Sequence, residues 1–159
     1  MAPKSNMETL RFEVRINAPV EDVYKIMLEE KSFLEWTSEF NESSHYEGSW
    51  EKGSKILFVG SDKDGTKGGM VSRIKENIPN KFVSIEHLGI LKGDEEITTG
   101  KDVEGWAGAL ENYTFEKDKD ATHLIVELDA NQEFKSYFQD TWPKALNRLK
   151  SICEKVSVK

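Results

Sequence analysis

The chain has 159 residues, of which 37% are hydrophobic and 32% charged, a mixture typical of one globular domain and not of a disordered chain. No apolar run approaches the ~20 residues of a membrane span, and the N-terminus lacks the apolar core of a signal peptide, so we expect a cytoplasmic location and no membrane partner. The net charge of −7, from 22 Lys and Arg against 29 Asp and Glu, argues against nucleic acid as a partner, because nucleic acid binds to clustered positive charge.

The first part of the chain predicts one strand and two short helices. We expect residues 1–7 to be a flexible tail and residues 8–156 to form a single domain. In "ETLRFEVRIN", residues 8–17, apolar and polar side chains alternate, which predicts a strand with one face in water. The next segments, "APVEDVYKIMLEE" and "KSFLEWTSEF", carry apolar residues at helical spacing and predict short helices over residues 18–30 and 31–40.

Residues 43–129 predict a run of about six short antiparallel strands, because apolar stretches alternate with turn signals rich in Gly, Asn and Pro. The last two strands form a hairpin with its polar turn at residues 117–120. Residues 92–108, "KGDEEITTGKDVEGWAG", are expected to be a long acidic loop, which in a compact domain is mobile or functional. In the first strands of this run, the pattern does not decide which face points inward.

Residues 131–156 predict one long amphipathic helix, with Asp129 or Asn131 as its N-terminal cap. Its apolar residues recur in steps of three and four: Phe134, Phe138, Trp142, Ala145, Leu149, Ile152 and Val156.

Pro143 interrupts this helical pattern. At roughly 100° per residue, it lies about 140° from the centre of the apolar stripe, on the polar side. Proline lacks an N–H and its ring clashes with the preceding turn, so we expect a kink or a break at residues 139–143. Residues 134–140 would then act as a hinged lid that admits a ligand.

The order of these elements predicts an α+β fold. A long helix must bury its stripe against the apolar face of the sheet, and a sheet of six to seven strands is too large for one helix to cover flatly. We therefore expect a curved sheet wrapped around the C-terminal helix, with an apolar cavity between them.

Four segments carry a resemblance to a known family: "FEVRINAPVEDVYKIM", "PNKFVSIEHLG", "GWAGALENYTF" and "TWPKALNRLK". Together with the element order, they resemble the START-like (SRPBCC) helix-grip superfamily, and within it the small bacterial proteins similar to activators of the Hsp90 ATPase. The resemblance covers residues 8–154. It implies the helix-grip fold and, for function, a protein that binds a sterol, lipid, hormone, polyketide or similar molecule, because fold alone does not fix function.

Several kinds of chemistry find no support in the sequence. The histidines, His45, His87 and His123, fall on separate predicted strands without a second ligand at metal-binding spacing, so we expect no metal. Nucleophile-elbow, dinucleotide and Walker motifs are absent, so no catalytic residue and no cofactor is assigned. The single cysteine, Cys153, lies on the apolar side of the last helix and is expected to be a buried, inert thiol.

The candidate site is a set of polar groups among aromatic residues. His87 shares a strand face with Val83 and Ile85, and Glu111 shares one with Tyr113, so both faces are expected to line the cavity. The alternatives are a hydrogen-bonded strand histidine and a carboxylate at the rim or paired with Arg or Lys. Three tryptophans are expected at the cavity mouth, the alternative being that each fills core volume. The full set of ligand-binding candidates is Trp36, Phe58, His87, Trp106, Glu111, Tyr113, Phe138 and Trp142.

Three functions stay open at this point. The first is a binding protein for a small apolar or amphipathic ligand. The second is a cyclase- or hydrolase-type enzyme that uses His87 and Glu111 as acid and base, provided that both reach one substrate. The third, suggested by the family name alone, is a chaperone partner. We favour the binding protein over the enzyme, as a monomer or weak dimer.

Overall fold

The structure, a computed structural model, describes residues 7–61, 64–101, 103–104 and 107–157. Along this part of the chain the elements are β1 (Met7–Ile16), α1 (Val20–Leu28), α2 (Glu30–Thr37), β2 (His45–Gly48), β3 (Lys55–Ser61), β4 (Lys67–Ile78), β5 (Phe82–Lys92), β6 (Glu95–Ile97), β7 (Ala109–Asp118), β8 (Ala121–Asn131) and α3 (Gln132–Ser157).

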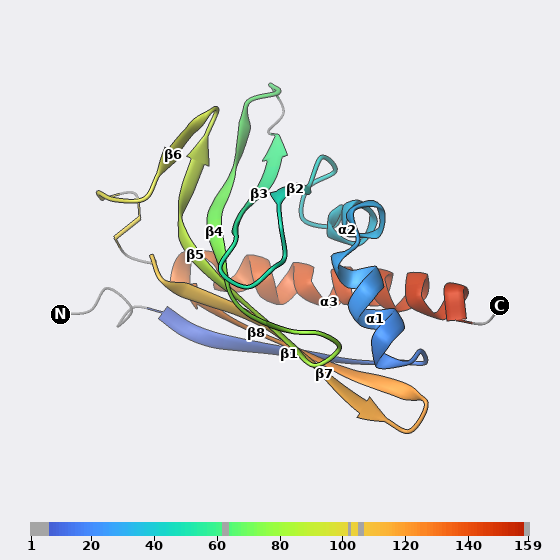
Figure 1. The fold of residues 1–159 in the computed structure, drawn as a ribbon. Coiled ribbons are helices and arrows are strands. Elements are labelled where there is room, and N and C mark those ends of the chain that lie inside the picture. Colours follow the sequence, from blue (N-terminus) through green and yellow to red (C-terminus); the bar gives the residue numbers. More distant parts are fainter. Residues whose placement is uncertain (1–6, 62–63, 102, 105–106, 158–159) are drawn as a thin grey trace.

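The strands form one antiparallel sheet in the order β1-β8-β7-β5-β4-β3-β2, and β6 pairs with β5 beside this path. Figure 1 shows the sheet curving around α3, and α1 and α2 pack against α3. The predicted α+β helix-grip arrangement is confirmed. One strand, β6, lies within the stretch that was predicted to be a loop.

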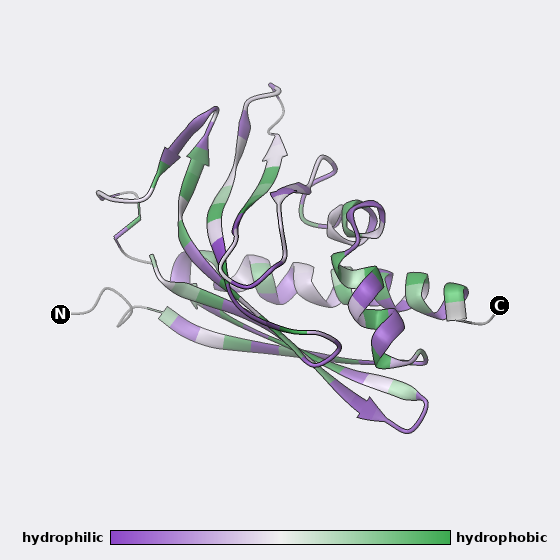
Figure 2. Ribbon diagram, in the orientation of Figure 1, coloured by the Kyte–Doolittle hydropathy of each residue, from purple (hydrophilic) through white to green (hydrophobic). Residues whose placement is uncertain are grey.

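The register of β1 and β8 confirms which residues of these strands face the helix. Val14 stands opposite Leu124 and Phe12 opposite Val126. Leu124 and Val126 are fully buried beneath the helices, whereas Ile125 between them points to the convex face of the sheet. Ile125 is nevertheless only 7% exposed, between Glu13 of β1 and Thr114 of β7 in the register. Figure 2 shows the same alternation as a change of hydropathy along β1.

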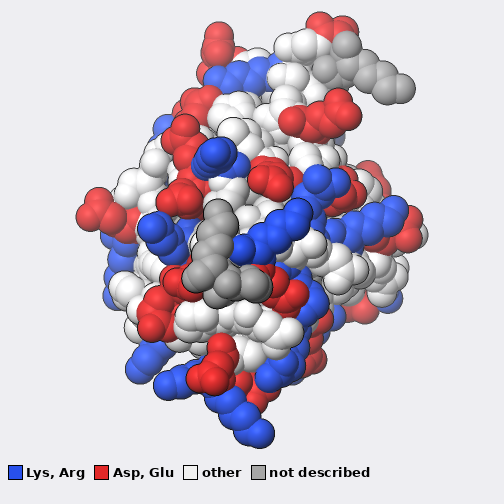
Figure 3. Space-filling model, turned by 90° about the vertical axis from the view of Figure 1, so that its right-hand side faces the viewer, with Lys and Arg blue, Asp and Glu red and all other residues white. Residues whose placement is uncertain are grey.

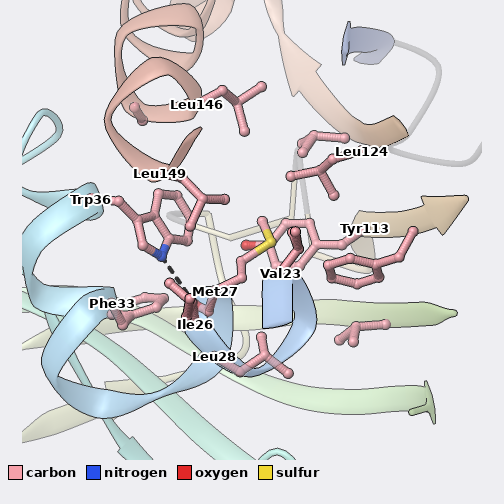
Figure 4. Close-up of a cluster of buried hydrophobic side chains, with 14 of the residues drawn as sticks. Val23, Ile26, Met27, Leu28, Phe33, Trp36, Tyr113, Leu124, Leu146 and Leu149 are labelled. Carbon is pink, nitrogen blue, oxygen red and sulfur yellow. Dashed lines mark hydrogen bonds between the residues drawn. The ribbon is translucent and has the colours of Figure 1, made fainter. Parts of the chain in front are cut away.

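The main core fills the space between the concave face and the three helices (Figure 4). The Trp36 indole N–H of α2 donates a 3.0 Å hydrogen bond to the Met27 carbonyl at the end of α1, which ties the two short helices together. Ten apolar side chains of the predicted strands and the long helix were expected to be buried together, and all of them belong to this core or pack against it: Leu10, Phe12, Val14, Ile16, Phe115, Leu124, Val126, Phe138, Leu149 and Ile152. Four of them are only partly buried, namely Phe12, Val14, Phe138 and Ile152.

The predicted break at Pro143 is wrong. Helix α3 runs without interruption from Gln132 to Ser157, so the chain does not break at residues 139–143. The predicted orientation of Pro143 is right: its side chain is exposed, while Trp142 and Ala145 beside it are buried. The packed inner side holds the helix together, and the Gln139 carbonyl that loses its partner lies on the water side, where solvent satisfies it.

Both ends of the predicted apolar stripe of α3 lie in solvent. Phe134 is 47% and Val156 51% exposed. The N-terminus is capped as predicted by Asn131, whose side-chain oxygen accepts the Phe134 backbone N–H at 3.1 Å. The other cap candidate, Asp129, lies within β8 and accepts the Leu110 N–H instead.

The charged side chains do not gather by sign on the face shown in Figure 3, where Lys and Arg are interspersed with Asp and Glu. Ion pairs such as Arg148 with Glu39 and Arg73 with Glu86 account for part of this mixing. Within the described residues, no helix is long and apolar enough to cross a membrane.

Candidate functional site

A β-bulge sets the inward face of β4 and β5. Ser72 stands opposite His87, and Met70, two residues earlier, stands opposite Ile90. Strand β5 therefore has one residue more than β4 between these pairs, Leu88, and the extra residue bends the strand. As a result His87 and Ile90 point to the same, concave face although they are three positions apart.

Burial on this concave face changes at the Ser72–His87 pair. On the side nearer the short helices, the inward-facing side chains are sealed: Ile74 and Ile85 are both 0% exposed. On the other side, three apolar side chains stay partly exposed, and we call them the open concave patch: Phe58, Met70 and Ile90.

Four hydrogen-bonded side chains on three strands, which we call the polar row, cross the sheet at this boundary. Ser72 Oγ lies 2.7 Å from His87 Nδ1, and His87 Nε2 lies 3.0 Å from Glu111 Oε1. The Tyr113 hydroxyl donates to the second oxygen of Glu111 at 2.5 Å. The side chains of His87 and Glu111 are 12% and 18% exposed, so the middle of the row is open to solvent.

One tautomer of His87 aligns the hydrogen bonds of the polar row in a single donor-to-acceptor direction. A neutral imidazole donates from one nitrogen and accepts at the other. If His87 Nε2–H donates to Glu111, its Nδ1 accepts the Ser72 hydroxyl proton, and the Tyr113 hydroxyl donates to Glu111 as well. With this tautomer, Ser72 donates to His87, and both His87 and Tyr113 donate to the Glu111 carboxylate.

Tyr113 is a permanent donor in this row. Burial of its ring, with the negative charge of Glu111 beside its hydroxyl, raises the pKa of Tyr113 well above the usual 10.0. The hydroxyl therefore keeps its proton near neutral pH, and it donates that proton to one oxygen of Glu111.

The tryptophan candidates do not gather at an open mouth. Trp36 is 1% and Trp142 3% exposed, and their rings are 5.9 Å apart within the core, which agrees with the volume-filling alternative. Trp142 also stacks on Phe12. Trp106 lies outside the described residues.

Of the two other aromatic candidates, Phe58 adjoins the polar row. The ring of Phe58 lies 6.1 Å from that of His87, edge to face. Phe138 is partly buried on α3 and contacts Phe134 and Tyr137, which are exposed. The structure thus brings Phe58, His87, Glu111 and Tyr113 together, and Trp142 lies next to Tyr113 with a ring distance of 6.3 Å.

A hollow of about 570 Å³ lies elsewhere, on the outer side of α3 against α2. Its lining is mixed, with Glu39 and Arg148 in an ion pair at 2.6 Å and Ile152 and Val156 as apolar members. This hollow is on the opposite side of the helix from the polar row. An enclosed cavity between sheet and helix stays a prediction.

Metal and thiol chemistry find no support in the described part of the chain. No group of three or more His, Cys, Asp or Glu side chains there is placed to hold a metal ion. The prediction of a buried thiol is confirmed: Cys153 is fully buried, and burial next to Asp22 and Glu154 raises its pKa to about 12. A thiol with that pKa is a poor nucleophile near neutral pH.

Sequence reasoning missed Ser72, Met70 and Ile90. Both faces of β3 and β4 carry apolar residues, because Leu57, Val59 and Val71 form a second cluster with Leu91 on the convex face. Alternation alone could not choose the inward face. The available signal for this face was Ser72, a polar residue within a largely apolar strand, beside the strand that carries the candidate histidine.

The chain matches one protein family over most of its length. The model of the family described as Activator of Hsp90 ATPase homolog 1-like protein matches residues 17–154, which confirms the resemblance seen in the sequence. No curated protein matches the chain in sequence.

Solved structures with the same fold come from several bacteria. An X-ray structure of a protein from Nitrosomonas europaea has a TM-score of 0.71 at 12% identity, covering 95% of this chain and 97% of that one. The AHSA1-like protein from Aeromonas hydrophila has a TM-score of 0.70 at 13% identity, with 96% of each chain covered. The Aha1 dimer from Colwellia psychrerythraea has a TM-score of 0.68 at 21% identity, covering 92% of this chain and 96% of that one. At these identities the similarity establishes the fold alone.

Proposed function

Because the chain belongs to the family of Activator of Hsp90 ATPase homolog 1-like proteins, we propose that it is a binding protein for a small amphipathic molecule, held between the open concave patch and the first half of α3. The observation that carries this proposal is the change of burial at the polar row. Apolar side chains that face into a helix grip and still contact solvent are available to a ligand, whereas those of the sealed half are not.

The polar row gives such a surface a fixed polar point. An amphipathic ligand would lay its apolar part on Phe58, Met70 and Ile90 and place its polar end at Glu111. Because Glu111 is held by both His87 and Tyr113, it does not need to reorganise when a ligand binds.

Acid–base catalysis by His87 and Glu111 is the second candidate, and the 3.0 Å contact between them favours it. Two features speak for binding instead. Both imidazole nitrogens are already hydrogen-bonded, so His87 would have to release Ser72 or Glu111 before it took a substrate proton. Ser72, the hydroxyl beside the histidine, is 0% exposed and out of reach of a substrate as a nucleophile.

Two experiments test this proposal, one that looks for the native ligand and one that uses an apolar probe. Native mass spectrometry of protein purified from its own host should detect a small molecule that travels with the chain. A solvatochromic apolar probe should bind to the wild type, and Met70→Glu should abolish binding, since it places a charge on the open concave patch. The matched control is Ile78→Glu at the far end of the same strand, where the Ile78 side chain is 45% exposed. This variant should bind the probe as the wild type does. Equal binding by both variants would refute the location.

Association with a chaperone, the cytoplasmic location and the monomeric or weakly dimeric state stay predictions.

A further inference from the structure

One group of the polar row keeps hydrogen-bond acceptor positions for a ligand. His87 uses both nitrogens, Ser72 is sealed, and the Tyr113 hydroxyl is committed to Glu111. A carboxylate has about four acceptor positions, and Glu111 uses two of them in these contacts. With 18% of its side chain exposed, Glu111 is the member of the row that keeps acceptor capacity on the open side.

The negative charge of Glu111 is also not paired with a lysine or arginine of the described residues. Other inward or surface carboxylates of this chain pair with Lys or Arg, as Glu86 does with Arg73 and Glu39 with Arg148. Among the described residues, the ion-pair partner of Glu111 is His87, and no lysine or arginine contacts it. A partly buried carboxylate in an apolar setting is stabilised by a cation, and no lysine or arginine of the described residues fills that place at Glu111.

The surroundings suit an organic cation. The ring of Phe58, which is partly exposed, lies 6.1 Å from that of His87, the residue that contacts the carboxylate. Aromatic faces attract ammonium groups, and the remaining wall is aliphatic or thioether, from Ile90 and Met70.

We propose that the ligand of this protein carries a protonated amine next to an apolar body, and that the amine donates to Glu111 while the body covers the open concave patch. This inference rests on the proposed binding function and names the chemical class of the ligand. His87 and Tyr113 are positioning residues in this arrangement, because they hold the carboxylate and do not contact the amine.

Three probes with one apolar body separate the head groups: octylammonium, 1-octanol and octanoate, each titrated by calorimetry below its micelle concentration. We expect octylammonium to bind roughly tenfold more tightly than 1-octanol, as one favourable charge contact implies, with octanoate weakest. Glu111→Gln should bring octylammonium and 1-octanol to similar affinities. The matched control, Glu86→Gln, changes a carboxylate on the opposite face of β5 that is paired with Arg73, and it should keep the preference.

The outcomes distinguish the two proposals. If 1-octanol or octanoate binds to the wild type as tightly as octylammonium, the binding function stands and the amine is wrong. If Glu111→Gln keeps the preference, the preference comes from the net charge of −7 and the amine is again wrong. If none of the three probes binds, both proposals fail. The comparison of the three probes on the wild type tests the amine proposal even if Glu111→Gln does not fold.

Discussion

The buried thiol of Cys153 makes a quantitative prediction about stability in alkali. Its pKa is raised from 9.0 to about 12 in the fold, chiefly by burial, then by Asp22 and Glu154. A raised pKa means that the folded protein holds the thiol proton more tightly than the unfolded chain does. The resulting stability is present in full below pH 9 and is lost as the pH rises toward 12.

The magnitude follows from the two pKa values. Between about pH 8 and about pH 10 the unfolded thiol ionises almost completely while the folded one stays protonated. This lowers the free energy of unfolding by about 1.4 kcal/mol, and the full shift of about three units corresponds to about 4 kcal/mol. Cys153→Ala removes the titrating group, so it should lack this part of the pH dependence.

The assay is urea unfolding followed by tryptophan fluorescence, in reducing buffer, for the wild type and Cys153→Ala at both pH values. Cys153→Ala will be less stable throughout, because it leaves a small cavity in the core, so the comparison is between slopes and not absolute values. Tyr113, whose pKa is also raised, begins to contribute near pH 10 equally in both proteins. Equal loss of stability in the two proteins would show that the thiol ionises as easily in the fold as in the unfolded chain, and would refute the reasoning.

Three further predictions concern the helices, and each is tested by urea unfolding. Leu149→Ala removes a side chain that is 0% exposed and should cost about 2–5 kcal/mol, whereas Leu34→Ala, at 41% exposure, should cost under ~1 kcal/mol; similar costs would contradict the assigned core. Pro143→Ala restores a helical N–H and removes the ring clash at an exposed site, so it should stabilise the protein by about 1–3 kcal/mol, and a loss of stability would mean that the proline fits the helix better than this geometry implies. Asn131→Ala deletes the cap of α3 and should cost about 1 kcal/mol, which Asn131→Asp should largely preserve; an unchanged Asn131→Ala would exclude the cap.

Strong periodicity explains why much of the fold was predictable from the sequence. The alternation in β1 and the hairpin of β7 and β8 determined their inward faces, and the long helix was evident from its apolar stripe. Pro143 was misjudged because a local rule was applied to a helix whose inner side is fixed by tertiary packing. The energy of that packing outweighs the single lost hydrogen bond, and no feature of the local sequence reports it.

The exposed ends of α3 show a second limit. Phe134 and Val156 fit the helical stripe, yet burial needs a partner surface as well as a suitable side chain. In β3 and β4, the sequence pattern also left open which face points inward. The same uncertainty hid Met70 and Ile90.

The contact between His87 and Glu111 depends on geometry at this level. In the register of β5 and β7, His87 stands opposite Ala109, and Glu111 stands opposite Ile85. The two polar residues are therefore diagonal neighbours on one face, a separation that only long side chains bridge. On its other side His87 stands opposite Ser72, and the extra residue Leu88 follows in β5 before Ile90 pairs with Met70. Without that bulge, Ile90 would move to the convex face and the polar row would border a different surface, so one extra residue joins a polar point to an apolar patch and makes the site amphipathic.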